Sequence, residues 1–571
     1  MNPKKSSMNM TNNEPDPISP MIEIIKNSLT AITDEMGATL KKSSYSPNIK
    51  TREDHTCSLF NDRLEMLAQT AHQIGHLGAF PFIVKETMKE HDVNRLEPGD
   101  TIILNDPYRG GTHLPDIILI SPIFFNHRPW GFVGNLAHHS DVGGMSPGSM
   151  SGTATEIFQE GIRIPSVMYM RKGKVVPDIQ KMILANVRTP EERKGDLAAQ
   201  IAANNIGIRR VHELINRYGL LKLNQFCDSL IEYCERRMCL EIRKIPDGMY
   251  EAEDFMDDDG TTDKPIRVKL CINKRGEDIT FDFTGTDEQR LGPCNADYYQ
   301  TMSLVMYTLR CITDPDIPQN EGCYRPIRLI VPKGTALNRR FPAASAAGWE
   351  ITRRVIDVFC RALKDVMRES VPAGSNGALN QFSFGGPMAE RGHYAVYETM
   401  GGGFGARYNK DGMDGVHSVS NTKNTPVEEM ELSYPVFYRR YSLWPDSEGA
   451  GKYRGGIGMM REITFLTDVT VTSITDRVKF KPWGIGKGED GSGSEFLIDS
   501  PDSSRQMKSK DLQRLSAGDT LCMHTTGGGG YGDSKERNSE LVRLDVADEK
   551  ISPMRAHEKY AWDGNPPEND S

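Results

Sequence analysis

The sequence contains no paired cysteine motif. Its ten cysteines are spread from Cys57 to Cys522, and none forms a Cys-x-x-Cys pair. This spacing excludes a zinc ribbon and a thioredoxin-type redox motif. A long chain with unpatterned thiols fits a reducing compartment, so we expect a cytoplasmic protein.

The sequence also lacks long apolar runs and an excess of positive charge. No apolar run approaches the roughly 18 residues that a membrane-spanning helix needs. The net charge of −9 and the pI near 5.9 argue against a nucleic-acid surface, as does the lack of a basic stripe with interleaved aromatic residues. Residues 1–17 contain lysines but no apolar core, so they do not read as a secretory signal. We expect a disordered tail over residues 1–18.

Complete motifs for nucleotide binding are missing. The glycine runs at residues 401–405 and 527–530 lack the Gly-Lys-Ser/Thr ending of a phosphate loop and the context of a dinucleotide fingerprint. We expect them to form tight turns or backbone surfaces around a substrate channel. Arg407 and Arg454 lie beside glycines and are candidates for binding a phosphorylated intermediate. Ser151-Gly152 lacks the pattern of a nucleophile elbow, and chemistry at a metal ion is the economical hypothesis.

The stretch from Leu104 to Gly144 is the richest in candidate functional residues. Apolar runs at 101–104, 117–120 and 130–133 predict three strands, and His113, Asp116 and His138 fall at the strand ends. Imidazole nitrogens with a carboxylate oxygen form a borderline ligand set that suits zinc or manganese. The alternative is a hydrogen-bonded loop without a metal, because a chain with thirteen histidines contains local pairs by chance.

Two other pairs of polar residues could support such a site. His72 and His76 are four residues apart on a predicted helix that continues to Met88. Both could bind a metal, although packing against polar neighbours is the favoured interpretation. Asp196 and Gln200 lie one turn apart on a helix predicted over residues 195–218. They either support the ligands or serve as a helix-start acid and a surface amide.

The remaining patterns predict a mixed α/β (α+β) fold with several domains. Apolar residues repeat at helical spacing from Ser19 to Leu40, with Ser19 as the cap and Pro20 in the first turn. Further helices are expected at 223–242, 297–312 and 352–369, a β-hairpin at 266–283, and strands at 462–465 and 469–474. We expect an N-terminal metal-binding α/β domain over residues 19–245. A C-terminal mixed α/β domain with glycine-rich loops should cover 246–535, and an extension 536–571.

Several motifs occur in an order that identifies a family. They are Asn-Asp-Pro-Tyr-Arg-Gly-Gly-Thr-His-Leu-Pro-Asp at 105–116, His-His-Ser-Asp-Val-Gly-Gly at 138–144, and the segments 195–200, 246–248, 449–456 and 527–533. With them the sequence resembles the hydantoinase B family from about Ser19 to about Trp562. This family comprises the B-type subunits of ATP-dependent hydantoinases, 5-oxoprolinases and lactamases. Acetone and acetophenone carboxylases contain related subunits.

The resemblance implies a metal site with four ligands. In the family, the metal is held by a His-x-x-Asp pair, a second His further along the chain and an upstream Asp. His113, Asp116 and His138 match the first three positions, and Asp54 is the expected fourth ligand. The ion would be zinc, manganese or iron. His139 or Asp141, which follow His138, would orient the attacking water or act as general base, or else would support the ligands.

The resemblance also implies a division of labour with a second protein. An A-type partner with an actin-like ATPase fold would bind ATP and Mg²⁺ and phosphorylate the substrate. The B-type subunit would then complete the hydrolysis of a small cyclic amide. We expect a hydantoinase, oxoprolinase or lactamase subunit in a heterotetramer or a larger complex. The alternatives are a subunit of an ATP-dependent ketone carboxylase, which bicarbonate dependence would reveal, and a scaffold subunit with a structural metal.

Overall fold

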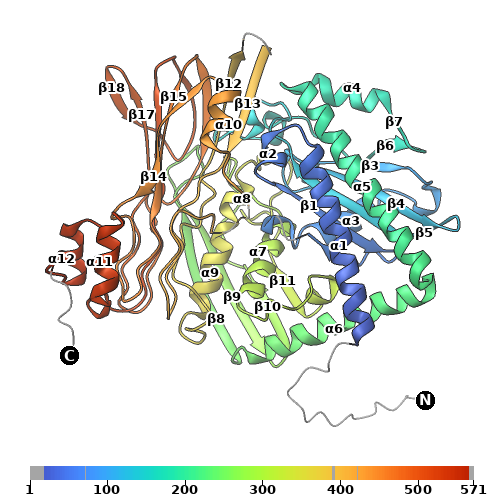
Figure 1. Ribbon diagram of the computed structural model, residues 1–571, viewed down its shortest axis with the longest axis horizontal. Coiled ribbons are helices and arrows are strands. Elements are labelled where there is room, and N and C mark those ends of the chain that lie inside the picture. The colour runs from blue at the N-terminus through green and yellow to red at the C-terminus, as the bar shows by residue number, and fades with distance from the viewer. Residues whose placement is uncertain (1–18, 71–72, 389–391, 419, 421, 565–571) are drawn as a thin grey trace.

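The computed structural model of the chain describes residues 19–70, 73–388, 392–418, 420 and 422–564 (Figure 1). The tail expected over residues 1–18 and His72 lie outside the described residues. Helices and several separate sheets occur along the described part, which confirms the mixed α/β, multidomain class. No helix among the described residues is long and apolar enough to cross a membrane.

A seven-stranded antiparallel sheet organises the first half of the chain. Its strand order is β2-β1-β5-β4-β3-β6-β7. The strands predicted at 101–104, 117–120 and 130–133 are confirmed as β3, β4 and β5. The bounds are β1 His55–Asn61, β2 Met66–Gln69, β3 Thr101–Leu104, β4 Asp116–Phe125, β5 Arg128–His138, β6 Val167–Arg171 and β7 Lys174–Val175.

Two long helices pack against the central strands of this sheet (Figure 1). α1 (Pro20–Ser43) begins after Ser19 as predicted and contacts β1, and α5 (Pro190–Tyr218) contacts β4 and β5. The two helices approach closely at Gly207, where a Cβ would lie 2.5 Å from Sδ of Met36. Four further helices complete this half: α2 (Pro47–Lys50), α3 (Phe80–Thr87), α4 (Pro177–Ala185) and α6 (Leu220–Lys244).

A four-stranded sheet and three helices form the centre of the molecule. The sheet begins with three antiparallel strands, β8 (Gly248–Met256), β9 (Ile266–Arg275) and β10 (Asp278–Asp282). The pairing of β9 with β10 confirms the predicted hairpin. A fourth strand, β11 (Ile327–Ile330), pairs in parallel with β10. α9 (Arg353–Leu363) packs on β8, β9 and α7 (Tyr298–Cys311), and α8 (Gly348–Ile351) precedes it. α9 ends before the predicted residue 369, because residues 365–370 are mostly exposed and bury no apolar face.

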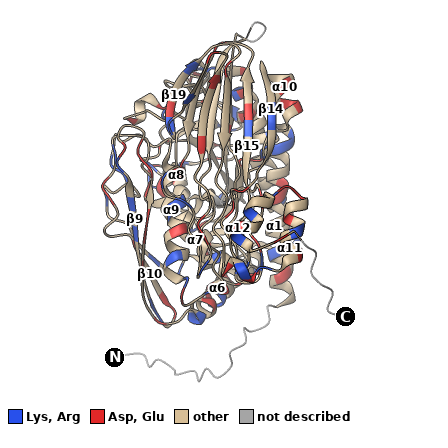
Figure 2. Ribbon diagram, turned by 90° about the vertical axis from the view of Figure 1, so that its left-hand side faces the viewer, with Lys and Arg blue, Asp and Glu red and all other residues tan. Residues whose placement is uncertain are grey.

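Two further sheets, with their own apolar cluster, lie at the C-terminal side (Figure 1). The strands predicted at 462–465 and 469–474 are confirmed within β15 and β16. Lys/Arg and Asp/Glu segments occur together on the last two helices, so neither helix carries charge of one sign (Figure 2). The remaining elements are β12 Gln381–Met388, β13 Gly392–Glu398, α10 Val427–Ser433, β14 Val436–Trp444, β15 Gly458–Phe465, β16 Val469–Ile474, β17 Glu495–Ser500, β18 Ser503–Gln506, β19 Lys510–Leu515, β20 Thr520–His524, α11 Ser539–Ala547 and α12 Pro553–Tyr560.

The main hydrophobic cluster extends across residue 245. It includes Ile25 of α1 and Ile242 of α6, and also Val268 of β9, Val355 of α9 and Ile485. The two halves therefore share apolar packing. The division of the chain at residues 245 and 535 stays a prediction.

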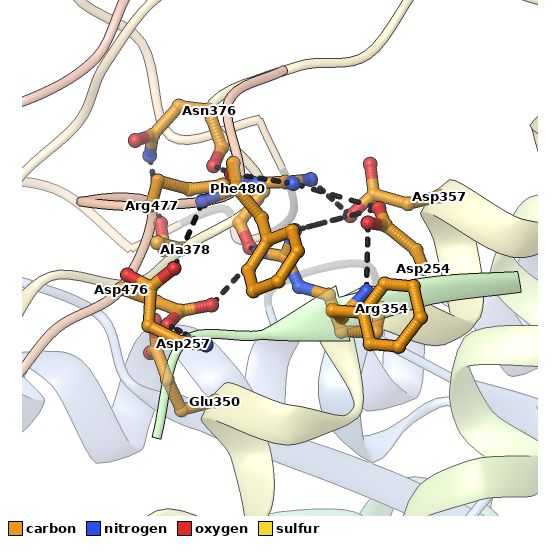
Figure 3. A network of polar contacts seen from close by, with 12 residues as sticks. Asp254, Asp257, Glu350, Arg354, Asp357, Asn376, Ala378, Asp476, Arg477 and Phe480 are labelled. Carbon is orange, nitrogen blue, oxygen red and sulfur yellow. Dashed lines mark hydrogen bonds and ion pairs between the residues drawn. The ribbon is translucent and has the colours of Figure 1, made fainter. Parts of the chain in front are cut away.

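A buried ionic network joins the centre of the molecule to the C-terminal sheets (Figure 3). Arg477, which follows β16, donates to Oδ2 of Asp357 on α9 (2.7 Å) and to the carbonyl oxygen of Asn376 (3.3 Å). Arg354 pairs with the same Asp357 carboxylate (3.1 Å) and with Asp254 on β8 (3.7 Å). The network holds the loop that begins at residue 376 against α9, and this loop reaches the candidate site.

Candidate metal centre

The pairing of β4 with β5 brings two predicted ligands together. Asp116, the first residue of β4, lies directly opposite His138, the last residue of β5. Side chains at such opposite positions are in contact. β1 pairs with the other edge of β5, and the N–H of His138 donates to the carbonyl of Asp54 (3.0 Å). His113 belongs to the turn before β4, where its carbonyl accepts from the N–H of Asp116 (3.1 Å).

Three of the predicted ligands form a tight, buried cluster. Nε2 of His113 lies 3.2 Å from Oδ2 of Asp116, and Nδ1 of His138 lies 3.3 Å from Oδ1 of Asp116. The two imidazole nitrogens are 3.1 Å apart. One ligand atom from each of the three residues lies within 4.8 Å of the other two. Asp54 lines the same small cavity, so the chain brings all four predicted ligands to one place.

Neighbouring side chains fix the two carboxylates. Oδ2 of Asp116 accepts hydrogen bonds from the hydroxyl of Thr112 and from Nε1 of Trp349 (3.4 Å). Oδ1 of Asp54 accepts from Nε2 of Gln73 (2.9 Å). Outer partners of this kind orient metal ligands. Because Trp349 belongs to α8, the second half of the chain contributes to the site.

An aromatic ring and an amide restrict His138. The ring of Tyr397 on β13 stacks on the imidazole with the ring centroids 4.4 Å apart. Arg52 lies over the Tyr397 ring, 5.0 Å from its centroid, and its Nη1 donates to Oδ1 of Asn48 (2.5 Å). Nδ2 of Asn48 in turn donates to the carbonyl of His138 (2.7 Å). Backbone and ring of His138 are thus held in one orientation.

The chemistry of the cluster fits a divalent cation. Burial alone would raise the pKa of Asp116, but His113, His138 and His76 together lower that pKa well below its ordinary value. Nδ1 of His113 and Nε2 of His138 are buried without a hydrogen-bond partner among the described residues. Close imidazole nitrogens beside an ionised carboxylate are the ligand types that zinc and manganese accept.

His139 and Asp141 do not line this cavity. Nε2 of His139 lies 3.0 Å from Oε1 of Gln200 on α5, and burial lowers the pKa of His139 to about 4. The carboxylate of Asp141 pairs with Arg188 (2.9 Å) and accepts from backbone N–H groups of the loop 143–148. The geometry therefore does not support the catalytic role predicted for these two residues, because their polar groups serve the neighbouring chain.

Asp196 and Gln200 support the backbone and His139 rather than the cluster itself. Oδ1 of Asp196 accepts from the N–H groups of Tyr45 (2.8 Å) and Ser46 (3.0 Å). Besides its contact with His139, Gln200 donates from Nε2 to the carbonyl of Ile117 on β4 (2.9 Å). Both α5 residues hold the segments that surround the ligands.

His76 lines the cavity although its sequence pattern favoured simple packing. Its Nε2 lies 3.7 Å from Oδ2 of Asp116, and its Nδ1 lies 3.0 Å from the hydroxyl oxygen of Thr56. The predicted continuous helix through Met88 is wrong, because the chain forms a 3₁₀ turn at Ile74–His76 and starts α3 later. Gly78 lies between them, where a Cβ would be 2.6 Å from Cα of Ser303 on α7.

The two arginines predicted to bind phosphate have different environments. Arg454 is almost completely buried and binds Asp414 (2.8 Å) and Asp545 (3.0 Å). Its guanidinium is therefore engaged in the fold, which argues against the predicted role. Arg407 lies over the ring of Phe404 and lines a separate cavity of about 750 Å³.

The glycine runs pack against one another through their backbones. A Cβ on Gly403 would lie 2.0 Å from the carbonyl oxygen of Gly456 and 2.3 Å from the nitrogen of Gly528. The N–H of Gly528 donates to the carbonyl of Gly456 (2.9 Å). This close approach requires glycine at these positions.

Comparison with known proteins assigns the family. A sequence model described as hydantoinase B/oxoprolinase matches residues 16–534. The chain belongs to this family. Its relatives include a Pseudomonas protein provisionally named as the B-type subunit of a D-/L-hydantoinase, which is 35% identical over 95% of this chain and 95% of that protein. 5-Oxoprolinase 1 of Arabidopsis thaliana is 33% identical over 93% of this chain, which spans only 43% of that longer protein.

Two solved structures of this fold resemble the chain closely. The ATP-dependent caprolactamase from Pseudomonas jessenii has a TM-score of 0.89 and 26% identity, covering 96% of this chain and 98% of that one. A nucleotide-free acetone carboxylase has a TM-score of 0.85 and 21% identity, covering 94% and 79%. The second likeness establishes the shared fold alone.

Proposed function

We propose that the chain is the metal-bearing hydrolytic subunit of an ATP-dependent cyclic amide hydrolase that opens a hydantoin, oxoproline or lactam ring. The observation that carries the proposal is the buried cluster of His113, Asp116 and His138, with Asp54 in the same cavity. These four residues would hold one divalent ion, zinc, manganese or iron. When bound, such an ion supplies a Lewis acid that polarises the amide carbonyl and lowers the pKa of water.

His76 takes the proton-transfer role in this proposal, in place of His139 and Asp141. Among the described residues, His76 is the one imidazole besides the two histidine ligands that lines the cavity. When Nδ1–H donates to the hydroxyl oxygen of Thr56, Nε2 carries the lone pair that accepts a proton from the attacking water. Replacement of His76 by Gln should then lower kcat while the metal content of the chain is retained.

An unstrained amide resists water, so the reaction needs an activating step. The name of the related caprolactamase includes ATP dependence, and the related Arabidopsis oxoprolinase is more than twice as long as the part that this chain matches. Both observations support an A-type ATPase partner that binds ATP and Mg²⁺ and phosphorylates the substrate. We place both subunits in a cytoplasmic heterotetramer or larger complex, and the ten free cysteines of this chain agree with that compartment.

The ketone carboxylase alternative is the weaker one, because it has only a likeness of fold in its support. Turnover of a cyclic amide that does not depend on added bicarbonate would favour hydrolysis. A scaffold subunit with a structural metal would keep full activity after His113→Ala.

Metal analysis of the purified chain tests the proposal. The wild type is compared with the His113→Ala/His138→Ala variant and with His393→Ala/His557→Ala, whose histidines are exposed and outside the cavity. We expect about one divalent ion per chain in the wild type and the control, and none in the first variant. A wild-type chain without a metal, purified in the absence of chelators, would sink the metal mechanism.

A further inference from the structure

Two of the ten cysteines lie against each other in the interior of the molecule. Cys234 is on α6, Cys323 ends a 3₁₀ turn at Glu321–Cys323, and their thiols are hydrogen-bonded to each other. Both residues are buried and both thiols are free. Because the two positions are far apart in the sequence, only the fold brings them together.

Close backbone packing keeps the turn against α6. Gly322 lies so near the helix that a Cβ on it would be 2.1 Å from the carbonyl oxygen of Ile231. Asn320, just before the turn, accepts from the N–H of Gly322 through Oδ1 (3.0 Å) and donates from Nδ2 to Sγ of Cys234 (3.2 Å). The same amide thus holds the turn and the sulfur on the helix.

The turn is also anchored to the N-terminal part of the chain. The carboxylate of Glu321 pairs with Nζ of Lys85 on α3 (2.5 Å). The hydroxyl of Tyr324, which follows the turn, donates to the carbonyl of Leu77. The turn cannot move away from α6 without breaking these contacts, so Cys323 stays beside Cys234 in the folded chain.

The surroundings of Cys323 favour its thiolate. The hydrogen bond with Cys234 and the positive charge of Arg310 on α7 lower the pKa of Cys323 to about 7, although burial opposes them. The same hydrogen bond, together with burial, raises the pKa of Cys234. All ten cysteines belong to the described residues, and Cys323 is the one whose pKa is lowered. When protonated, Cys323 donates to the carbonyl of Pro318 (3.2 Å). A thiolate beside a protonated thiol is an arrangement that can form a disulfide.

We propose that Cys323 and Cys234 form a peroxide-sensitive pair, in which Cys323 is the reacting thiolate and Cys234 closes an intramolecular disulfide. Burial selects the oxidant. Neither residue has exposed surface, so a large oxidant such as glutathione disulfide is excluded by its size, whereas hydrogen peroxide is little larger than water. The disulfide would join α6 to the turn that precedes β11.

The reaction consumes one hydrogen peroxide for each disulfide. The thiolate of Cys323 attacks one peroxide oxygen, the O–O bond breaks, and the hydroxide that leaves takes up a proton to become water. The sulfur of Cys234 then attacks the resulting sulfenic acid, and the S–OH bond breaks as the S–S bond forms. The hydroxyl group leaves as a second water with the proton of Cys234. The two thiols are oxidised by two electrons, which reduce the peroxide.

Peroxide treatment of the folded, full-length chain tests the pair. The reduced chain is treated with hydrogen peroxide in small molar excess, the remaining thiols are alkylated with N-ethylmaleimide during denaturation, and linked peptides are mapped by mass spectrometry. We expect two thiols to be lost first, in a linkage of Cys234 to Cys323 that dithiothreitol reverses. Cys311 is exposed. Oxidation of Cys311 while the pair stays reduced would show that exposure alone governs reactivity and would overturn the proposal.

Three variants assign the two roles. Cys234→Ser removes the second thiol, so Cys323 should be oxidised to the sulfinic acid, which dithiothreitol does not reduce. Cys323→Ser removes the reacting thiolate, so Cys234 should stay reduced. The matched control is Cys239→Ser on the same helix, in which the cross-link should form as in the wild type. Oxidation of Cys234 at the wild-type rate in Cys323→Ser would contradict these roles. The wild-type peptide map needs no variant, so it tests the pair even where a substitution prevents folding.

Discussion

Replacement of Glu350 by Gln should remove a pH-dependent loss of stability. Glu350 lies on α8 beside Trp349, is almost completely buried, and accepts a hydrogen bond through Oε2 from the N–H of Leu379 (3.0 Å). Burial, and after it the charge of Asp476, raise its pKa from 4.5 to about 7. Between these pH values the folded chain keeps a proton that the unfolded chain has released. The free energy of unfolding therefore falls as the pH rises through this window.

The rise in the pKa of Glu350 sets the size of the effect. Each pH unit corresponds to about 1.4 kcal/mol, so ionised Glu350 lowers the free energy of unfolding by about 3 kcal/mol above its folded-state pKa. A glutamine cannot ionise, and its Oε1 can still accept from Leu379. Relative to wild type, Glu350→Gln should therefore gain about 3 kcal/mol between about pH 4.5 and about pH 8.

Urea unfolding followed by circular dichroism at several pH values measures this difference. The control is Glu369→Gln, because Glu369 is exposed and its variant should follow the wild-type curve. The measured quantity is the difference between each variant and wild type, which cancels the contribution of the other buried acids. A Glu350→Gln difference that is the same at low and high pH would refute the reasoning.

Three further changes test other parts of the structure. Thr112→Val removes the hydroxyl that donates to Asp116, and competition with a chelator should show metal affinity reduced about 10–100-fold without loss of fold. Arg477→Met leaves the buried carboxylates of Asp254 and Asp357 to share the guanidinium of Arg354, and should lower the free energy of unfolding by about 3–5 kcal/mol in urea titrations. Arg210→Met, which removes only surface ion pairs, should leave it nearly unchanged. Gly403→Ala places a Cβ against two backbones and should abolish the cooperative thermal transition that the wild type shows by calorimetry.

The ligand cluster could be predicted because strand ends carry local information. Apolar runs fix β4 and β5, and an antiparallel turn between them places Asp116 opposite His138. The same rule of alternation explains why His139 does not line the cavity. Successive residues of a strand point to opposite faces, so a ligand at His138 directs the side chain of His139 away from the cavity and toward α5.

The walls of the site could not be predicted from spacing. The predicted ligands all precede residue 140, but residues from much later in the chain also line their cavity. These residues are Trp349 of α8, Arg353 of α9, Leu379 of a loop and Tyr397 of β13. No local periodicity relates such distant segments, since their meeting depends on the shared core and the buried ionic network. The role of Arg454 was missed for the same reason, because its partners Asp414 and Asp545 lie far along the chain.

The division of the site between the two halves bears on how the chain works. All four predicted ligands lie in the N-terminal sheet region, yet Trp349 fixes Asp116 and Tyr397 stacks on His138 from the second half. The cluster is therefore oriented in part by groups that the first 245 residues do not contain. Arg353, which lines the small cavity, also lines a cavity of about 750 Å³ whose lining residues all lie beyond residue 300. The relatives match more than nine-tenths of the chain, as expected if both halves are needed to build the site.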